Sequence, residues 1–254
     1  DALPILRRTE VNPDFLERVG NTVTPPPTWL YSKDRKEVYD VSLPMAAAGY
    51  MSILTLAKPP KEIFEAIRKI SEESFDKVIE DLNSSYEKYL ALKEEEQKKL
   101  PWKTNVKLYG ELYKQAVEDS GESFTKAMED LMKEIKTGIR DQKLTTINAA
   151  YAIIEKTLEF VNDMSPIVVI ALAPPYYPNV NNLSLPDMKP RIDEAMDEVV
   201  AMAKSEWNQD CYTQNFFTGI SDLSYAMFAV DDENIGYIED NMMLWKDVYY
   251  IPLE

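Results

Sequence analysis

The chain has 254 residues, of which 45% are hydrophobic and 28% charged, a composition typical of a folded globular protein. Its 28 Lys and Arg residues against 44 Asp and Glu residues give a formal net charge of -16. Because such a field repels phosphate backbones and anionic lipid head groups, we expect neither nucleic acid nor a membrane as a partner. The longest purely apolar run, Ile167 to Ala173, is far shorter than the roughly 20 residues that a membrane span needs.

Two residue types are scarce enough to exclude whole classes of site. The chain contains no histidine, so it cannot build a Ser-His-Asp or Cys-His catalytic set, and it offers only carboxylates and one cysteine to zinc. The single cysteine, Cys211, cannot form an internal disulfide, and no basic segment followed by an apolar one is present at the N-terminus. We therefore expect a cytoplasmic protein in which Cys211 is a buried, small apolar residue.

The N-terminal third is expected to contain a short helix and two strands. Ile5 to Leu16 predicts the short helix and a turn at Asn12, with a stop at Gly20. The β-branched and aromatic content of Thr22–Asp34 and Val38–Leu56 predicts two extended strands around a turn at Ser32–Lys36.

The middle of the chain has helical periodicity. Apolar residues from Ile63 to Tyr89 recur every three to four positions, which predicts an amphipathic helix that Pro101 ends. If it were unbroken to Lys99, it would span about 58 Å, so it either breaks near Ser84-Ser85 or projects from the domain. Three further helices are expected over Leu108–Glu118, Ser123–Arg140 and Thr145–Val161.

The last third mixes strands with one clear helix. The run Ile167–Ala173 predicts a buried strand, and Tyr212–Phe217 predicts a short one. Between them, Asp187 is expected to cap a helix that has Pro190 in its first turn. Its buried side is expected to hold Ile192, Met196, Val199, Ala203 and Trp207. The whole pattern predicts an α+β fold, in which a small antiparallel or mixed sheet is covered by a large helical layer.

One turn is the main candidate for a binding site. Gly219 supplies a permissive backbone, and Ser221 or Asp222 can cap the helix expected after it. Free amides at such a helix start also favour an anion, so Gly219, Ile220, Ser221 and Asp222 could face a substrate carboxylate while serving as the turn.

Three other patterns are better explained by structure than by chemistry. Pro174–Pro178 predicts a rigid connector, which we favour over substrate stacking on Tyr176 or Tyr177. The acids Asp193, Glu194, Asp197 and Glu198 have a spacing suited to Ca²⁺ or Mg²⁺, but a solvated helix face explains them better. The two Ser-x-x-Lys matches, Ser74 to Lys77 and Ser123 to Lys126, are interpreted as coincidences inside charged helices.

Three segments carry a family resemblance. They are NTVTPPPT from Asn21, APPYYPNV from Ala173 and FTGISDLSY from Phe217. Taken together and in this order, they resemble the zinc-dependent aminoacylase and carboxypeptidase family of metallopeptidases. The resemblance implies a two-domain hydrolase of amino-acid or arginine metabolism, whose metal-bearing catalytic domain is interrupted by a lid domain that often mediates dimerisation. Gly219 to Asp222 lies where the family has a Gly-Gly-Thr-Asp loop lining the active site, and Ile220 and Ser221 depart from that pattern.

The resemblance also implies a division of the chain. Residues 1–178 would form a lid-type α/β sandwich for dimerisation, with a helical insertion over about 61–162, and residues 187–254 a partial return into the catalytic domain. The family's metal ligands, which include two histidines, match no residue here, so the chain has no expected catalytic or metal-binding residues and alone should be inactive. Zinc or another divalent metal is expected only in the full-length family member.

Two main functions remain open from the sequence, and a third, an autonomous acidic hydrolase that uses paired carboxylates, is not excluded, although nothing singles out one pair among the 44 acidic residues. In the first, the chain is a fragment of a metal-dependent amide hydrolase that acts on a small amino-acid-derived substrate, and it forms a homodimer. In the second, it is a non-enzymatic helical interaction or dimerisation module whose long helix binds a partner helix or its own copy.

Overall fold

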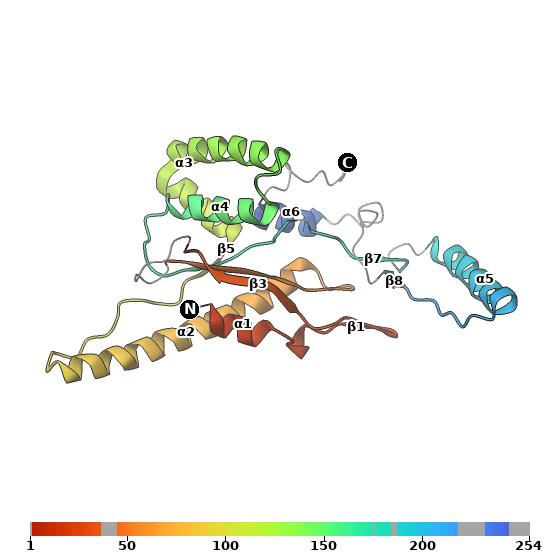
Figure 1. Cartoon of the computed structure of the whole chain (residues 1–254), viewed down its shortest axis with the longest axis horizontal. Helices are drawn as coiled ribbons and strands as arrows, with labels where there is room; N and C mark the ends of the chain where they lie inside the picture. Colours follow the sequence, from red (N-terminus) through yellow and green to blue (C-terminus); the bar gives the residue numbers. More distant parts are fainter. Residues whose placement is uncertain (1, 37–44, 175, 184–186, 218–231, 244–254) are drawn as a thin grey trace.

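The fold is mostly helical, with short strand pairs packed against the helices (Figure 1). The computed structural model describes residues 2–36, 45–174, 176–183, 187–217 and 232–243. The expected α+β class is confirmed. The helices are α1 (Leu3–Thr9), the 3-10 turn η1 (Pro13–Phe15), α2 (Pro60–Leu92), α3 (Tyr109–Arg140), α4 (Thr146–Leu158), α5 (Lys189–Trp207) and α6 (Asp232–Asn241). The strands are β1 (Arg18–Val19), β2 (Thr22–Val23), β3 (Thr28–Asp34), β4 (Ala47–Ser52), β5 (Val106–Leu108), β6 (Val168–Ile170), β7 (Val180–Asn181) and β8 (Phe216–Phe217).

The strands are shared among small sheets rather than gathered into one. Within the described ranges, β1 pairs with β2, β3 with β4 and β7 with β8, all antiparallel, while β5 and β6 run parallel. A two-stranded sheet buries too little surface to be stable alone. The helices therefore provide most of the core against which these strand pairs rest.

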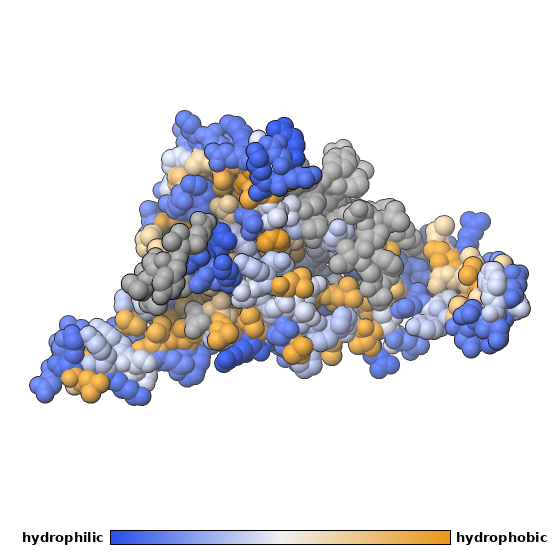
Figure 2. All heavy atoms as spheres, in the orientation of Figure 1, coloured by the Kyte–Doolittle hydropathy of each residue, from blue (hydrophilic) through white to orange (hydrophobic). Residues whose placement is uncertain are grey.

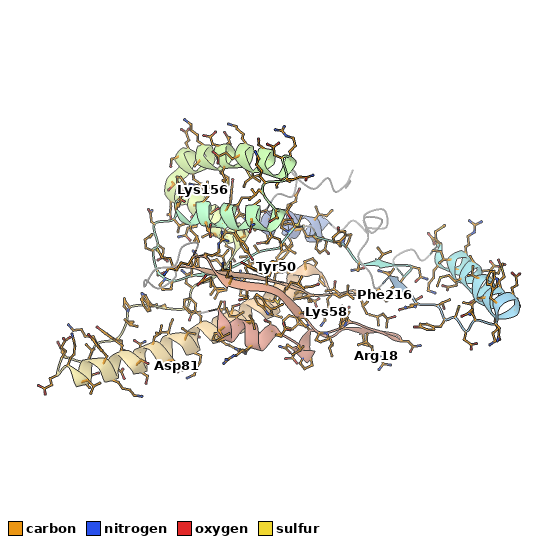
Figure 3. All side chains as sticks on the ribbon, in the orientation of Figure 1. Arg18, Tyr50, Lys58, Asp81, Lys156 and Phe216 are labelled. Atoms are coloured by element: carbon orange, nitrogen blue, oxygen red, sulfur yellow. The ribbon has the colours of Figure 1, made fainter. Side chains whose placement is uncertain are left out.

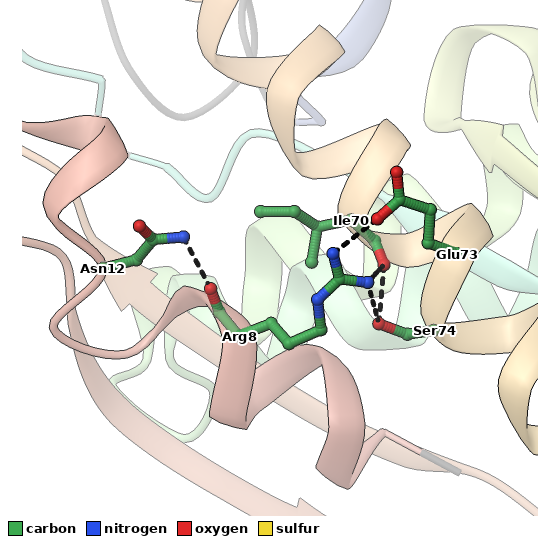
Figure 4. Close-up of polar contacts among 5 residues, drawn as sticks. All are labelled: Arg8, Asn12, Ile70, Glu73 and Ser74. Carbon is green, nitrogen blue, oxygen red and sulfur yellow. Dashed lines mark hydrogen bonds and ion pairs between the residues drawn. The ribbon is translucent and has the colours of Figure 1, made fainter.

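The N-terminal helix α1 is fastened to α2 by one arginine (Figure 4). Arg8 Nη1 donates to the Ile70 carbonyl and to Ser74 Oγ, each at 3.3 Å, and its Nη2 pairs with Glu73 at 2.5 Å. The side-chain amide of Asn12 donates to the Arg8 carbonyl at 2.7 Å. The short helix, which would be marginal alone, is thereby fixed along the first half of α2.

A buried carboxylate fixes the loop that leads into α2. Glu17 is only 8% exposed, and its Oε2 accepts from the Leu56 amide at 2.8 Å. Its Oε1 accepts from the amides of Ala57 and Lys58 at 2.6 and 3.0 Å. The Glu17 amide donates to Thr24 Oγ1 at 2.9 Å, so the β1–β2 hairpin and this loop are bound to one point.

The hairpin of β3 and β4 is longer than the sequence predicts. Lys33 and Asp34 pair with Ala48 and Ala47, so the turn expected at Ser32–Lys36 is wrong and the connection starts later. Charged residues are tolerated there because this end of β3 is exposed.

At the other end of the hairpin, Trp29 organises the contacts. Its indole N–H donates to Thr9 Oγ1 at 2.7 Å, and its amide donates to Glu10 at 2.6 Å. A Cβ at Gly49 would lie 2.6 Å from the Trp29 ring, which explains why glycine occupies that position.

Helix α2 is unbroken at Ser84-Ser85 and projects from the body (Figure 1). Its 33 residues correspond to about 50 Å. The first half buries apolar residues such as Ile63, Ile67 and Phe75 against the rest of the fold. The expected extension to Lys99 is wrong, because the helix ends at Leu92 and Glu94 adopts a left-handed conformation with φ 57°.

The main core lies between α3 and α4. The two helices expected over 108–118 and 123–140 are the segments of α3 on either side of Gly121, whose φ of 51° and ψ of -126° break the helical geometry. Ser120 Oγ donates to the Phe160 carbonyl at 2.8 Å, which fixes the bend against the end of α4. The fold-back buries Leu112, Ala116, Phe124, Ile135, Ala149 and Ile153.

The parallel pair β5–β6 separates two cores. Val169 packs against the core of α3 and α4, whereas the adjacent Ile170 packs against the cluster formed by Phe15 of η1 and by Ile63 and Ile67 of α2. The uninterrupted apolar run is thus explained by cover on both faces. The strand itself is shorter than expected and half-buried rather than buried.

Helix α6 returns to the start of α3. The Asn241 side chain accepts from the Gly110 amide at 3.2 Å, and its carbonyl accepts from the Leu172 amide at 2.9 Å. A Cβ at Gly110 would lie 2.8 Å from the Asp240 carbonyl oxygen, so the close approach requires glycine. Over the ranges given above, no helix combines the length and the apolar character needed to cross a bilayer.

Helix α5 lies at the far end of the molecule from the projecting end of α2 (Figure 1). Pro190 is in its first turn, but Met188 rather than Asp187 occupies the cap position, without a side-chain hydrogen bond. The expected buried side is wrong, because only Ala203 of that helix is buried, while Val199 and Trp207 are 63% and 62% exposed. The apolar spacing predicts the helix correctly and does not guarantee a covering layer.

Candidate functional site

Two of the three segments that carry the family resemblance meet in one strand pair. The segment from Ala173 ends in β7, and the segment from Phe217 begins in β8. Val180 pairs with Phe217 and Asn181 with Phe216 in an antiparallel ladder (Figure 3 labels Phe216). The segment from Asn21 lies in β2 and the start of β3, which belong to other sheets.

The predicted substrate loop follows β8 directly. Gly219, Ile220, Ser221 and Asp222 lie outside the described residues, so their role stays a prediction. The strand before the loop is well anchored, since Phe216 is only 5% exposed and β8 is bonded to β7.

A polar cluster lies beside this ladder and was not foreseen from the sequence. Asn182 is 8% exposed; its amide donates to the Asn215 carbonyl at 3.1 Å and its side-chain Nδ2 to Asp193 of α5 at 3.3 Å. Asp193 also pairs with Lys189 one turn earlier. The Asn-rich run from 179 to 182 was the available signal, but the sequence could not show that Asp193 lies next to it.

The carbonyl oxygen of the Asn182 side chain is an acceptor that no described donor uses. Its Oδ1 is buried and meets no hydrogen-bond donor in the described part of the chain. Leaving such a group unpaired costs about 1–3 kcal/mol. The ladder therefore places an unsatisfied carbonyl oxygen at its base, able to accept from an N–H group.

The acidic residues of α5 form the largely solvated helix face that the sequence favours. Glu194, Asp197 and Glu198 are exposed, and Asp193 is engaged by Lys189 and Asn182. Across the described ranges, no group of three or more Asp, Glu or Cys side chains is placed to hold a metal ion.

The connector predicted over Pro174–Pro178 leads into β7. Pro174 and Pro178 are buried in this segment, and burial raises the pKa of Tyr176 to about 12.

The prediction that Cys211 is buried is wrong, because the residue is exposed. It follows the end of α5 at the left-handed Asn208, in a stretch where residues 208 to 215 are all exposed.

Neither Ser-x-x-Lys match forms an activated serine. Ser74 Oγ donates to the Ile70 carbonyl at 2.6 Å, and Ser123 Oγ donates to the Ser120 carbonyl at 2.7 Å. Both hydroxyl protons are thus held by helix carbonyls, which supports the interpretation of these matches as coincidences.

An arginine and three tyrosines connect the β3–β4 hairpin to α4. Arg35 forms a two-pronged pair with Glu155, with Nε to Oε1 at 2.7 Å and Nη2 to Oε2 at 3.3 Å. The guanidinium carbon lies 4.9 Å from the centre of the Tyr151 ring, and Tyr31 stacks on Tyr50 at 5.8 Å. Burial, followed by the influence of the other two tyrosines, raises the pKa of Tyr151 to about 12. Since the guanidinium is already paired, this group acts as a structural link.

A second polar junction lies where α2, α3 and α6 meet. Glu111 accepts from Arg68 at 2.7 Å and from the Leu108 amide at 2.8 Å. Burial alone would raise the pKa of Glu111, but the hydrogen bonds from Arg68 and Leu108 outweigh it and lower the pKa. Nearby, burial raises the pKa of Tyr237 to about 12, and the ring of Tyr237 packs edge-on against Phe64. The Phe64–Tyr237 contact joins α6 to α2, while Arg68 and Glu111 pair with each other.

Fold and site together define a mostly helical α+β protein whose strongest site candidate is the β7–β8 ladder with Asn182. The chain is 23% identical over 248 residues to the uncharacterized protein YqjN of Bacillus subtilis (strain 168). It is 22% identical over 252 residues to protein RocB of the same organism. Each alignment covers 98% of this chain but 43% of the relative, so the chain spans less than half the length of these curated relatives.

These relatives establish distant homology over nearly the whole chain. No protein-family model matches the sequence, and no solved structure matches it. The comparisons thus show a RocB-like relationship at about 22% identity, and the assignment of the three segments to a metallopeptidase family stays a prediction.

Proposed function

We propose that the chain forms the lid-type portion, and the adjoining substrate-side segment, of a metal-dependent amide hydrolase of the aminoacylase and carboxypeptidase type. The observation that carries this proposal is the alignment of 98% of the chain with 43% of RocB and of YqjN. The substrate would be a small amino-acid derivative, in keeping with amino-acid or arginine metabolism. A cytoplasmic location is part of the proposal, and the single cysteine supports it.

The residues present do not fit the zinc or other divalent metal that such an enzyme uses. The chain has no histidine, Cys211 is exposed, and Asp193 is already paired with Lys189. A hydrolytic zinc centre needs about three protein ligands, usually with histidine among them. In this proposal the metal is therefore bound by polypeptide that corresponds to the unaligned part of the relatives.

What this chain would supply is substrate recognition. Residues 1–178, with the helical insertion over about 61–162, would be the lid, and residues 187–254 would lead into the catalytic domain. The loop Gly219 to Asp222 would offer backbone amides to a substrate carboxylate, because free amides before a helix favour anions. Asn182 Oδ1, which meets no donor among the described residues and lies next to the ladder that precedes this loop, could accept from the substrate's amide N–H.

A second candidate function, a helical interaction or dimerisation module without enzymatic activity, is supported by the projection of α2 from the body. Nothing in that module would depend on a metal. The two proposals therefore separate in an activity assay.

The experiment is a hydrolysis assay on purified YqjN and RocB with a panel of N-acyl amino acids, N-acyl arginine included. Release of the free amino acid that is lost with a chelator and restored by zinc supports the proposal. Absence of hydrolysis across the panel with zinc, manganese and cobalt overturns the hydrolase assignment and favours the interaction module. If the relatives are active, leucine and alanine substitutions at the positions that align with Asn182 and Gly219, respectively, should raise KM more than they lower kcat.

A further inference from the structure

Helix α5 is joined to the β7–β8 ladder by a polar contact. Only Ala203 of this helix is buried, and Figure 2 shows hydrophobic and hydrophilic groups side by side over α5, at the right-hand end of the molecule. Asn182, which directly follows β7, donates from Nδ2 to Asp193 Oδ1 at 3.3 Å. The bond connects the buried end of the ladder to the second turn of the helix.

The position of Asn182 is fixed on its backbone side. Its amide donates to the Asn215 carbonyl at 3.1 Å, so its main chain continues the ladder by one position. Its side chain is enclosed, because the residue is only 8% exposed. The main freedom that remains is a half-turn of the carboxamide, which exchanges the carbonyl oxygen and the NH2 group.

Asp193 determines which of these two orientations is populated. An ionised carboxylate can only accept hydrogen bonds, and Lys189, one turn earlier in α5, pairs with its second oxygen, Oδ2. The NH2 group of Asn182 must therefore face Asp193, because a half-turn would bring the carbonyl oxygen against a carboxylate oxygen. As a result, Asn182 Oδ1 is the buried acceptor that meets no donor in the part of the chain that the structure describes.

An acceptor held in this way discriminates between ligands by their donors. It stabilises a ligand that brings an N–H group, and it repels a ligand that brings another acceptor in the same place. A secondary amide and an ester have nearly the same shape and differ in that respect, since the ester has an oxygen where the amide has its N–H. A buried polar group left unpaired is what rejects the wrong one of two such ligands.

We propose that Asp193, held by Lys189, is a positioning residue that orients the Asn182 carboxamide and thereby makes this site select secondary amides over esters. The inference rests on the proposed function only in treating the bound amide as a substrate. It adds the residues that set the selectivity, which belong to α5 and do not touch the ligand themselves.

The test is nuclear magnetic resonance of the full chain labelled with 15N and 13C, with the side-chain signals of Asn182 followed during titration. The two probes are N-methylacetamide and methyl acetate, which differ in the N–H group. For the wild type, N-methylacetamide should shift these signals with an apparent Kd in roughly the millimolar range, as expected for so small a ligand. Methyl acetate should bind about tenfold more weakly or worse.

The variant Asp193→Asn separates orientation from simple support of α5. The new side chain keeps the shape and can still accept from Asn182, but it can also present an NH2 group, so that the Asn182 carboxamide can turn. The preference for the amide should fall below about threefold, with tighter binding of methyl acetate. A residue that only held α5 in place would weaken both probes alike. Asp197→Asn is the matched control, since Asp197 is exposed one turn further on, and it should leave the preference unchanged.

Two results would overturn the proposal. One is a wild type that responds equally to both probes or to neither, and the other is an Asp193→Asn protein of unchanged circular dichroism that keeps the wild-type preference. The probes are bound by this chain and not cleaved, so the result is separate from the hydrolysis assay on YqjN and RocB. Inactive relatives would remove the hydrolase function and leave the positioning role standing, whereas active relatives would not rescue a site without selectivity.

Discussion

Replacing one buried carboxylate oxygen should destabilise the whole N-terminal third of this protein. In Glu17→Gln the side chain keeps its shape, but one of its two oxygens becomes an NH2 group that faces an amide N–H. At present both oxygens accept, one from Leu56 and the other from Ala57 and Lys58. The variant therefore loses the charge from every bond and turns at least one of them into a clash of donors.

The magnitude follows from the number of bonds. A hydrogen bond to a charged group contributes about 1.5–3 kcal/mol, and an amide left unpaired in a buried position costs about 1–3 kcal/mol. Glu17 is 8% exposed, so water does not readily replace the lost partner. We expect a loss of about 2–4 kcal/mol in the free energy of unfolding.

The assay is urea unfolding followed by far-ultraviolet circular dichroism and by tryptophan fluorescence, with the slope of the transition compared between variants. A matched control is Glu10→Gln, since Glu10 accepts from a single amide, that of Trp29 at 2.6 Å, and should cost less. A Glu17→Gln protein within about 0.5 kcal/mol of the wild type would refute the reasoning, because surface changes without structural role fall in that range.

Three further changes test separate parts of the fold. Gly121→Ala should lower the free energy of unfolding by about 1–3 kcal/mol, because φ 51° and ψ -126° suit glycine alone. Gly236→Ala is the matched control: it has open space and no positive φ, so it should leave thermal stability unchanged or raise it. Gly110→Ala should loosen α6, since its Cβ would lie 2.8 Å from the Asp240 oxygen; faster hydrogen exchange in α6 is the readout, and unchanged exchange would speak against the close contact. Folding lowers the pKa of Glu111 below 4.5, so the stability that Glu111 contributes is present above pH 4.5 and is lost as the pH falls through the folded pKa. The Glu111→Gln variant should therefore lose less stability than the wild type when the pH is lowered. An unchanged dependence of the free energy of unfolding on acidic pH would contradict this.

The helical part of the fold could be predicted because its causes are local. The spacing from Ile63 onward fixes where α2 begins, and a glycine between two apolar periodicities marks the bend in α3 at Gly121. The apolar run around Val169 predicts a strand between two cores, and β6 lies there, although it is shorter than expected and half-buried. In each case the pattern and the structure share one physical origin, the burial of apolar side chains.

The remaining features depend on contacts that no local pattern contains. Arg35 meets Glu155, 120 residues later, and Glu17 receives amides some 40 residues away. The apolar side of α5 predicts a helix, but whether a layer covers it is decided elsewhere, and Val199 is exposed. The prediction that Cys211 is buried is wrong for the same reason, because the usual burial of cysteine does not show that this residue lies in an exposed stretch.

The candidate site also has one part that the sequence predicts and one part that depends on distant contacts. The turn from Gly219 to Asp222 was predicted from its letters alone and lies outside the described residues. Asn182 could not be selected from the sequence, because it stands out only through a buried oxygen that meets no donor in the described part of the chain and through its bond to Asp193. The structure adds the ladder that joins two of the resembling segments, which the sequence order did not show.

The central claim is that this polypeptide serves a metal-dependent hydrolase without itself holding the metal. Titration calorimetry of zinc into the purified chain tests it most directly. The account predicts no saturable binding tighter than about 1 μM, because no histidine is available as a ligand. Stoichiometric binding below that concentration, accompanied by zinc-dependent cleavage of an N-acyl amino acid by this chain alone, would contradict it.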